Sequence, residues 1–405
     1  MAAAALVVVA VLVLGAIWLG SDAHGTTSES AQPPLPQANT ASVVPNTLVE
    51  SWRAQSPATP APVVTGSAVV TGDGGTVEGI DPVDGSSAWS YSRDVSLCGV
   101  TSAWNTALAV FRDDRGCSEA TELDGASGTR KAQRTSDADQ DIHLSDDGTY
   151  VTSRGTTRME LWRSDLVRTL EYGRVDAPVN PNSQPRSGCT LLSSASNSSR
   201  IAVLENCPDE DAARLSTLNP APKDAQQPEE YGSSVVAALT GKDGPIDGAT
   251  ILVASGDRVA LAIPAHSSEP AKIALFDGNA QPITEFDLPA ELAVDSFTES
   301  PSVTKAANVF SWWTGKGTVA LGLSDLSPLW TISGALGPGA LMAGKLLIPV
   351  PDGILVIDPA TGTADRTITV DREGYTGPIG TAVIGDTVVE QRGDTVVALA
   401  DPNRP

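Results

Sequence analysis

The sequence predicts an all-β fold, an eight-bladed β-propeller built from four-stranded antiparallel blades, and three observations predict it. A unit of two short apolar strands around a polar turn recurs eight times along the 405-residue chain. The chain contains 37 Gly and 29 Pro residues, which suits a protein with many turns. No long amphipathic helical pattern interrupts the strands, which are short, rich in Val and Ile, and broken by Gly.

The repeated unit is clearest in "GGTVEGIDPVDGSSAW" (74–89) and "DGILVIDPATGTADRTI" (352–368). In both copies an Asp begins the turn and a Gly ends it: Asp81 with Gly85, and Asp358 with Gly362. The mean spacing of the turns is about 46 residues, which is the period of four-stranded propeller blades. The eight turn positions are Asp81, Asp124, Arg163, Asn219, Asp277, Ser324, Asp358 and Asp401.

The last unit has only three predicted strands, whereas "LVESWRAQS" (48–56) is a predicted strand without a blade. Trp52 in this segment occupies the place that Trp89 and Trp330 hold in the fourth strands of their units. We therefore expect residues 48–56 to complete the eighth blade, because closure of the ring removes exposed sheet edges. The alternative is that Trp52 is simply an aromatic residue of a linker.

The N-terminal segment predicts a membrane anchor and a linker ahead of the propeller. Residues 1–20 contain an uncharged apolar run long enough to span a bilayer, and we interpret them as a transmembrane signal anchor. A cleaved signal peptide, with "SDA" (21–23) as the cleavage region, is the alternative. Residues 21–47 are rich in Ser, Thr, Pro and Ala and predict a linker that holds a propeller at 48–405 off the membrane. These features predict a single-pass protein whose C-terminal domain is extracytoplasmic, or a secreted protein if the segment is cleaved.

The four cysteines form two pairs that are close in sequence, and we expect the disulfides Cys98–Cys117 and Cys189–Cys207. Each pair lies near the start of a first strand and near the turn between the second and third strands. Because first and third strands of one sheet lie roughly 9–10 Å apart, at least one partner is expected in a turn. Disulfides imply an oxidising compartment.

The charge balance excludes one class of partner. The chain has 26 Lys and Arg against 49 Asp and Glu residues, a net charge of −23. A nucleic-acid-binding protein must supply cations to the phosphate backbone, so we expect no nucleic acid partner.

The units 74–89 and 352–368 resemble the repeat of the PQQ-like (quinoprotein dehydrogenase-like) eight-bladed propellers. The Ala-rich composition and the excess of Arg over Lys also resemble membrane-anchored members from high-GC actinobacteria. The resemblance implies structural roles for Trp52, Asp81, Gly85, Trp89, Trp330, Asp358 and Gly362, with each Trp packed over the neighbouring blade. Dehydrogenases of this family carry a vicinal Cys–Cys pair, a Trp platform and calcium ligands around the quinone. Adjacent cysteines do not occur in this sequence, so we expect no cofactor and no catalytic residue.

Two other patterns have a functional and a structural interpretation. Asp137, Asp139 and Asp141 alternate as in a calcium loop, but Ile142 and Gly148 stand where an EF-hand needs Gly and Glu. An acidic connection between blades is the preferred interpretation, and we expect no metal site. The adjacent pair Trp312 and Trp313 predicts core packing, with a binding hot spot as the alternative.

The sequence thus predicts a non-catalytic, membrane-anchored propeller that acts as a protein-interaction scaffold in a bacterial cell envelope, with envelope proteins as partners. The alternative is a quinoprotein-type dehydrogenase, or a receptor that binds a small ligand or sugar in the central channel. The side chains that line the channel distinguish these functions.

Overall fold

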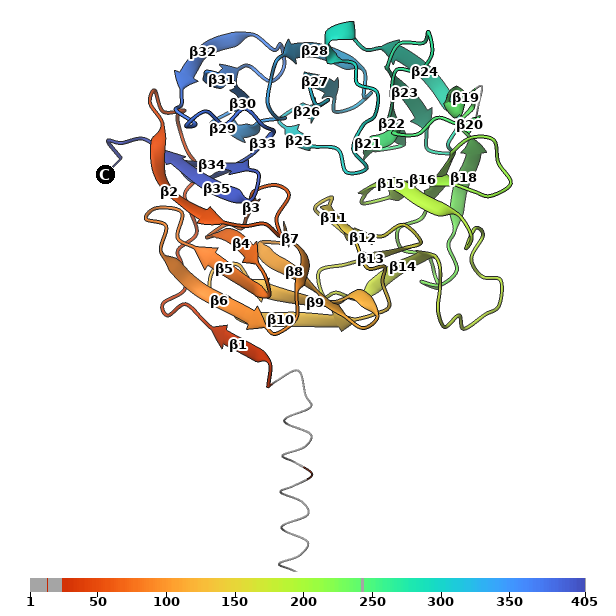
Figure 1. Cartoon of the computed structure of the whole chain (residues 1–405), viewed down its shortest axis with the longest axis horizontal. Helices are drawn as coiled ribbons and strands as arrows, with labels where there is room; N and C mark the ends of the chain where they lie inside the picture. The colour runs from red at the N-terminus through yellow and green to blue at the C-terminus, as the bar shows by residue number, and fades with distance from the viewer. Residues whose placement is uncertain (1–12, 14–23, 242–243, 405) are drawn as a thin grey trace, which may run out of the picture.

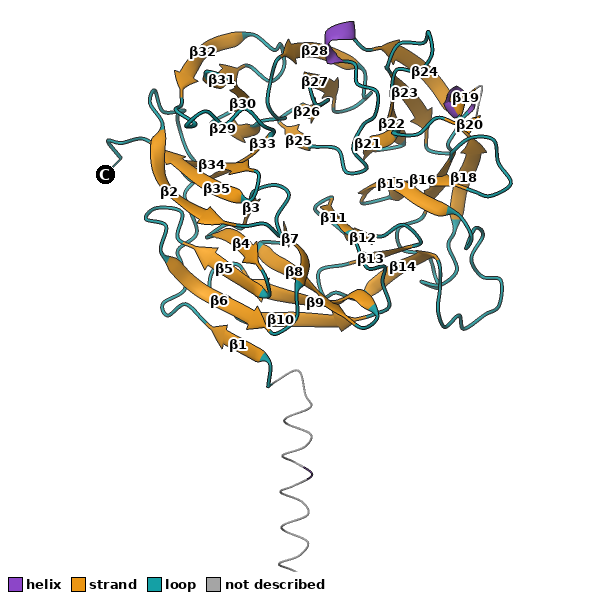
Figure 2. Ribbon diagram, in the orientation of Figure 1, coloured by secondary structure: helices purple, strands orange, loops and turns teal. Residues whose placement is uncertain are grey.

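The eight-bladed propeller is confirmed by the structure, a computed structural model that describes residues 13, 24–241 and 244–404. Eight antiparallel sheets follow one another around a central opening (Figure 1). Strands dominate the described residues, and the short 3-10 turns η1 (Ala237–Leu239) and η2 (Ala290–Leu292) are the helical elements drawn in Figure 2.

The first four blades follow the order of the sequence. Blade 1 contains β3 (Val63–Val64), β4 (Val69–Asp73), β5 (Thr76–Ile80) and β6 (Ser87–Arg93). Blade 2 contains β7 (Leu97–Ala103), β8 (Thr106–Asp113), β9 (Gly116–Asp124) and β10 (Arg130–Thr135). Blade 3 contains β11 (His143–Asp146), β12 (Val151–Arg154), β13 (Arg158–Trp162) and β14 (Arg168–Gly173). Blade 4 contains β15 (Thr190–Asn197), β16 (Arg200–Asn206), β17 (Arg214–Leu218) and β18 (Glu230–Val235).

The other four blades complete the ring. Blade 5 contains β21 (Thr250–Ser255), β22 (Arg258–Ile263), β23 (Lys272–Asp277) and β24 (Pro282–Asp287). Blade 6 contains β25 (Val303–Ala306), β26 (Val309–Trp313), β27 (Gly317–Gly322) and β28 (Pro328–Ser333). Blade 7 contains β29 (Ala340–Met342), β30 (Lys345–Val350), β31 (Gly353–Ile357) and β32 (Ala364–Thr369). Blade 8 contains β33 (Ile379–Ile384), β34 (Thr387–Arg392), β35 (Thr395–Ala400) and β2 (Val49–Gln55). A small hairpin, β19 (Thr240–Gly241) and β20 (Gly244–Pro245), lies between blades 4 and 5.

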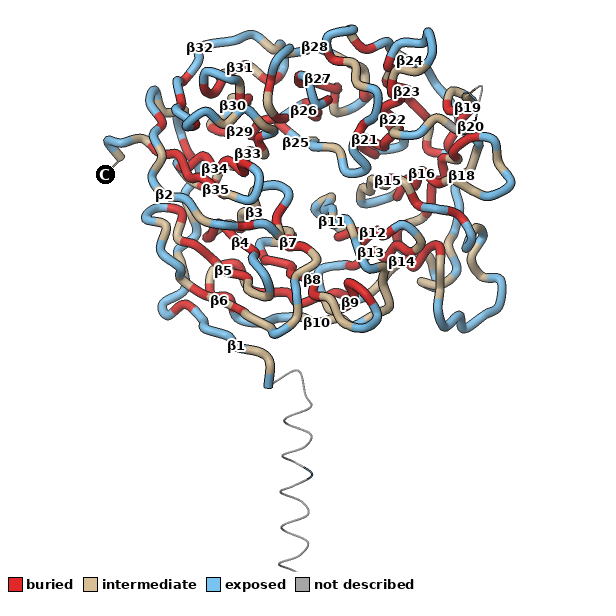
Figure 3. The backbone as a smooth tube through the Cα atoms, viewed as in Figure 1, coloured by how far each residue is buried: buried red, intermediate tan, exposed pale blue. Residues whose placement is uncertain are grey.

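The core lies between the faces of neighbouring blades, where the middle strands are buried (Figure 3). All residues of β34 are buried, and so are all but the first residue of β22. Both faces of these strands are covered by adjacent blades. Strand β22 is accordingly an apolar run after Arg258, whereas β34 buries Glu390, Gln391 and Arg392 and satisfies them by hydrogen bonds. The outermost strands β2 and β10 instead alternate between exposed and partly buried positions, because one face of each meets solvent.

The predicted closure of the ring is confirmed. Strand β2 pairs antiparallel with β35, with Val49 opposite Ala400 and Trp52 opposite Ala398. The N-terminal part of the propeller thus supplies the outermost strand of its last blade. Segments more than 340 residues apart share one hydrogen-bonded sheet, as the bond from the Ser51 hydroxyl to the Ala398 carbonyl illustrates.

The segment ahead of β2 contacts the propeller, whereas its composition predicts a linker that holds the propeller off the membrane. Strand β1 (Thr26–Glu29) pairs antiparallel with β6 and adds a fifth strand to blade 1. It lies at the rim of the ring, as Figures 1 and 2 show. The free edge of β6 offers unpaired backbone groups, and an extended polar segment can pair with such an edge whatever its side chains. Composition therefore did not reveal this strand.

Residues 30–48 continue along the propeller rather than away from it. The Ala31 amide donates to the Ser127 carbonyl of blade 2, and the Ala38 amide donates to the Gly66 carbonyl of blade 1. The Arg366 guanidinium of blade 7 donates to the carbonyls of Val44 and Pro45 at 2.8 and 3.0 Å. We call residues 26–48 the strap, because they fasten the chain across blades 1, 2, 7 and 8.

The predicted anchor at residues 1–20 lies outside the described residues, apart from Val13. Within the described ranges, no helix combines the length and the apolar character that crossing a bilayer requires.

Candidate functional site

Three tryptophans of outermost strands lie on the neighbouring blade. The indole Nε1 of Trp89 in β6 donates to the Gly125 carbonyl of blade 2 at 3.2 Å. The indole of Trp330 in β28 donates to the Pro359 carbonyl of blade 7 at 3.0 Å. Trp52 in β2 donates to the Pro82 carbonyl of blade 1 at 3.3 Å. Each contact is made with the turn that joins the third and fourth strands of the next blade.

The Asp and Gly residues of these turns have distinct roles. The Asp81 carboxylate accepts the Val83 amide at 2.8 Å, and the Asp358 carboxylate accepts the Ala360 amide at 2.9 Å. Gly85 has φ +76°, and a Cβ placed on it would lie 2.5 Å from the Trp52 ring. Gly362 has φ +70° and would place its Cβ 2.6 Å from the Trp330 ring. The turn needs Gly for its left-handed backbone and for the close approach of the indole.

Both predicted disulfides are present. Cys98–Cys117 joins Cα atoms 5.8 Å apart within blade 2, and Cys189–Cys207 joins Cα atoms 4.3 Å apart at the edge of blade 4. Cys189 and Cys207 lie just outside β15 and β16, as the strand spacing requires.

The prediction that at least one partner lies in a turn was wrong for the other pair. Cys98 lies in β7 and Cys117 lies in β9. The pairing of β7 with β8 shifts at residues 97–99, and the pairing of β8 with β9 shifts at residues 111–113. These irregularities interrupt the regular strand spacing on which the argument depended.

One group of potential metal ligands occurs among the described residues: Cys189, Glu205 and Cys207, with ligand atoms within 4.8 Å of one another. The two sulfurs are joined in the disulfide. The Glu205 carboxylate accepts the hydroxyls of Tyr172 and Ser216 at 2.8 and 2.6 Å. The residues of this group are thus committed to structural contacts.

The alternating aspartates do not converge on one point. The Asp139 carboxylate accepts the amide and hydroxyl of Thr157 at 2.7 and 2.6 Å and the Arg158 amide at 3.1 Å. Asp141 is almost fully exposed and pairs with Arg112. Asp139 therefore serves as a brace between blades 2 and 3, which agrees with the structural interpretation of this acidic connection.

The adjacent tryptophans of β26 have separate environments. Trp312 is buried and packs edge-on against Phe297, with ring centroids 5.2 Å apart. Trp313 is partly buried, and its Nε1 donates to the Ala335 carbonyl at 2.8 Å. Both residues thus pack within the protein.

A cavity of about 640 Å³, which we call the channel pocket, lies among the innermost strands of blades 3 to 6. Its walls come from these strands, β11, β15, β21 and β25, from residues 299–301, and from Arg154 of β12 and Phe310 of β26. Leu252, Val253, Val303 and Phe310 supply apolar wall. This size and mixture of surfaces are typical of pockets for small ligands.

Arg154 and His143 lie beside Glu299 in this channel pocket, and Lys305 is a further cation of its lining. The Glu299 carboxylate lies 3.6 Å from Nη1 of Arg154 and 3.4 Å from Nε2 of His143. Burial lowers the pKa of Arg154. Burial and the positive charge of Arg154 both lower the pKa of His143 below its ordinary value. Glu299 opposes both effects because its negative charge favours the protonated forms.

Two adjacent acids line the pocket at the end of β11. His143 begins this strand, Asp146 ends it, and Asp147 is the next residue. Asp146 is exposed to solvent and forms part of the pocket wall. Desolvation, with a contribution from Asp147, raises the pKa of Asp146 to about 6 against the effect of a hydrogen bond from the Gly148 amide. The Asp147 Oδ2 atom is buried and has no hydrogen-bond partner. This end of the pocket is therefore acidic.

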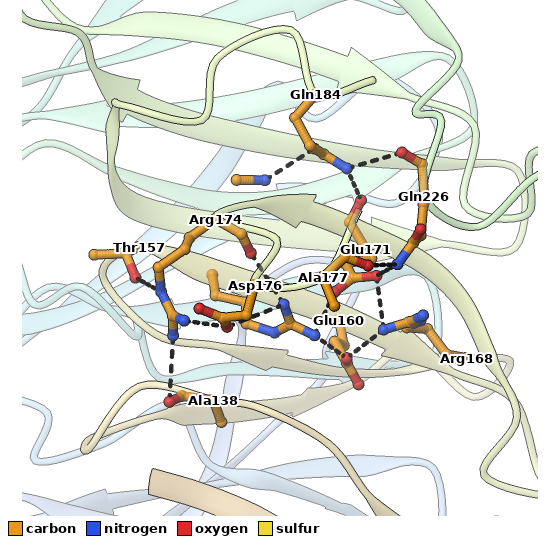
Figure 4. A network of polar contacts seen from close by, with 12 residues as sticks. Ala138, Thr157, Glu160, Arg168, Glu171, Arg174, Asp176, Ala177, Gln184 and Gln226 are labelled. Carbon is orange, nitrogen blue, oxygen red and sulfur yellow. Dashed lines mark hydrogen bonds and ion pairs between the residues drawn. The ribbon is translucent and has the colours of Figure 1, made fainter. Parts of the chain in front are cut away.

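A second polar cluster lies away from the channel, between blades 2, 3 and 4 (Figure 4). The Glu160 carboxylate of β13 accepts hydrogen bonds from Arg134, Arg158, Trp162 and Arg168 at 2.8 to 3.0 Å. Desolvation raises the pKa of Glu160, but these partners outweigh it and lower the pKa to about 2. Glu160 therefore remains ionised inside the protein.

The same cluster holds two surface connections. The Gln226 side chain, from the connection between β17 and β18, donates to the Glu171 carboxylate at 3.0 Å. The Gln184 side chain, from the connection 174–189 between β14 and β15, donates to the carbonyls of Glu171 and Gln226 at 2.9 and 3.1 Å. Its oxygen accepts the Gly173 amide at 3.1 Å.

Sequence reasoning did not identify the channel pocket or the polar cluster. Arg154 and Glu299 are 145 residues apart, and no spacing rule joins them. The charges of "TTRMELWRSD" within an apolar strand were the available signal for the cluster, since a buried strand that contains Arg158 and Glu160 must pair them.

No protein family profile matches the sequence, and a search of curated proteins finds no significant relative. Several solved structures share the fold. BamB from Moraxella catarrhalis is 14% identical and aligns over 88% of this chain and 100% of its own, with a TM-score of 0.52. The computationally designed Ika8 protein is 14% identical over 90% of this chain and 100% of its own, with a TM-score of 0.51. Sqt1 from Saccharomyces cerevisiae is 12% identical over the same shares, with a TM-score of 0.52. At these identities the likeness shows the fold alone, and the chain is an eight-bladed β-propeller.

Proposed function

We propose that this chain is a non-catalytic scaffold that binds partner proteins in a bacterial cell envelope, anchored by its N-terminal segment with the propeller outside the cytoplasm. The observation that carries the proposal is an exposed connection held in place by a buried polar cluster. Rigid frames that present fixed loops are typical binding platforms.

The connection 174–189 is the loop concerned. Gln184 fixes one part of it through three hydrogen bonds to blade 3 and to Gln226. The Val179 amide donates to the Gln226 side chain at 3.0 Å, while the residue itself is 79% exposed. An apolar side chain is thus displayed on a backbone that is already ordered, so a partner would lose little conformational entropy on binding.

The two disulfides support the proposed compartment. Two disulfides in one propeller are typical of proteins that fold in oxidising environments. The strap supports a tethered arrangement, because it fixes the chain to the rim of blade 1 at Thr26, directly after the predicted anchor. Anchoring itself is tested by fractionation: we expect the full-length protein to stay with membranes at high salt and to be released only by detergent. Release without detergent would contradict it.

The quinone of the resembling dehydrogenases does not fit the channel pocket. Phe310 is the single Phe, Tyr or Trp among the residues that line it, and it is 9% exposed, which leaves little ring surface for stacking. The pocket favours instead the second candidate, a receptor for a small ligand, because charged groups and apolar wall converge there.

Site-specific photo-crosslinking in the native envelope tests the scaffold proposal. A photoreactive amino acid at Val179 should give one discrete adduct with a partner protein. The matched control is Val83, which is 58% exposed on blade 1, and it should not give that adduct. The variant Gln184→Ala should reduce the Val179 adduct, because it frees the loop. If neither position gives a specific adduct and the purified protein oxidises substrates with added quinone and calcium, the proposal is wrong.

A further inference from the structure

One cation of the channel pocket, Arg154, is buried while its counterion is exposed. The Arg154 side chain is 3% exposed, and the Glu299 side chain beside it is 53% exposed. Arg154 donates to the Leu191 carbonyl at 3.2 Å and to the Glu299 carbonyl at 3.4 Å. Among the described ion pairs, Glu299 is its one carboxylate partner. A buried guanidinium with one loosely held counterion favours binding of another anion.

Glu299 reaches this position from the opposite side of the pocket. It belongs to the connection 288–302 between β24 and β25, whereas Arg154 ends β12 of blade 3. The connection is anchored by Leu292, which is buried, and by Phe297, which packs against Trp312. Residues 298–300 beyond these anchors are exposed. The Glu299 carboxylate can therefore leave Arg154 without unfolding a blade.

We propose that the channel pocket binds a monoanionic organic carboxylate with a compact apolar body, and that its carboxylate replaces that of Glu299 on Arg154 and His143. Leu252, Val253, Val303 and Phe310 line the space for the apolar body. A guanidinium is suited to a carboxylate because it donates parallel hydrogen bonds.

Two other acids of the pocket oppose a second negative charge on the ligand. Asp146 and Asp147 line the same cavity at the end of β11. Like charges brought together in a partly desolvated site repel, so a second anionic group placed beside these carboxylates should weaken binding. Lys305 of β25 also lines the pocket, and its side chain is the place where a second anionic group would meet a cation.

Binding of N-acetyl-L-phenylalanine to the full-length protein in detergent tests the proposal, with the neutral N-acetyl-L-phenylalaninamide as the matched probe. Ligand-observed NMR should detect saturable binding of the acid and weaker binding of the amide. A pentapeptide that ends in Phe distinguishes the source of the carboxylate: tighter binding than the acid points to a protein C-terminus, and weaker binding points to a free small molecule. Equal affinity for acid and amide would overturn the proposal.

Variants identify the site. Glu299→Gln removes the internal competitor, so it should tighten binding of the acid by about two- to fivefold, the range of an exposed ion pair. Glu291→Gln, an exposed acid of the same connection in η2, is the control and should leave the affinity unchanged. Arg154→Gln should weaken binding at least about tenfold. If Glu299→Gln leaves the affinity for the acid unchanged, the ligand does not compete with the Glu299 carboxylate for Arg154, and the proposal is wrong. This outcome can be read even if Arg154→Gln fails to fold.

Discussion

At the scale of single residues, the contact between an indole and the turn of the next blade recurs around the ring. Trp52, Trp89 and Trp330 each donate a hydrogen bond to a turn carbonyl, and a Gly lies beneath the ring. The motif is therefore an interface between blades as well as a turn. This explains why it can persist in a protein in which we assign it no catalytic role.

Gly85→Ala tests this contact. The change adds a Cβ that would lie 2.5 Å from the Trp52 ring, at φ +76°. Gly74→Ala is the matched control, because Gly74 has φ +56° but nothing within 4 Å of its Cβ position. We expect the control to lose about 1 kcal/mol of unfolding free energy from backbone strain, and Gly85→Ala to lose a further 1–3 kcal/mol or so from overpacking. Urea denaturation measures both, and equal losses would contradict the packing role.

Some residue roles could be predicted from the sequence and others could not. Trp52 could be assigned to the eighth blade because Trp89 and Trp330 occupy the same place in their units. No such template exists for Arg154 and Glu299. A lone charge beside an apolar strand is typical of a solvent-facing position, and only the closed ring brings residues of blade 3 and of the connection 288–302 together.

At the scale of elements, the charged strand β13 adds buried ion pairs to the apolar packing between blades 2 and 3. Arg158 bridges Glu160 and Glu171, and all three side chains are nearly inaccessible. Breaking one partner of such a network is costly, because a charge then remains buried without compensation. The network also orders the connections that carry Gln184 and Gln226.

Acid should weaken this element in a defined range. The pKa of Glu160 is about 2 in the folded protein against a model-compound value of 4.5. Because folding lowers this pKa, the ionised Glu160 carboxylate contributes roughly 3 kcal/mol to the unfolding free energy. This contribution is complete above about pH 4.5 and is lost as the pH falls toward 2. The unfolding free energy of wild type should therefore fall more steeply in acid than that of Glu160→Gln. Glu285→Gln, which changes a partly exposed acid, should follow wild type. Parallel curves for wild type and Glu160→Gln would rule out this role.

The disulfide of blade 2 should contribute measurably to stability. Cys98 and Cys117 are 19 residues apart, and a crosslink over such a segment restricts the unfolded chain by about 3 kcal/mol in the loop-entropy account. The double variant Cys98→Ser/Cys117→Ser should lose about 2–4 kcal/mol in chemical denaturation. Wild type in a reducing agent should lose at least as much stability as the variant, because both disulfides are then open. A variant as stable as oxidised wild type would show that the bond adds nothing.

At the scale of the whole molecule, repetition made the fold predictable. The spacing of eight turns predicted the number of blades. Seven of these turns join the third and fourth strands of a blade as expected, and the eighth follows β35, beside which β2 supplies the fourth strand. The strap was not predictable, because β1 pairs through its backbone and its sequence "TTSE" carries no apolar pattern. The packing of Ala31, Ala41 and Leu48 on distant blades likewise depends on the assembled ring.

The strap and β2 have different roles in the ring. Strand β2 supplies the outer edge of blade 8 and carries Trp52, so its loss would expose the edge of β35 and remove a contact to blade 1. The strap lies over blades that are already complete. Removing the strap should therefore leave the ring closed, whereas removing β2 should open it.

Thermal unfolding of two shortened proteins, one that begins at residue 48 and one that begins at residue 57, tests most directly that an N-terminal strand closes the ring. Both lack the strap up to residue 47, and only the second lacks β2. We predict one cooperative transition for the first, and for the second a melting temperature more than about 10 °C lower, or self-association through the open β35 edge. Equal melting temperatures with both proteins monomeric would contradict the closed ring.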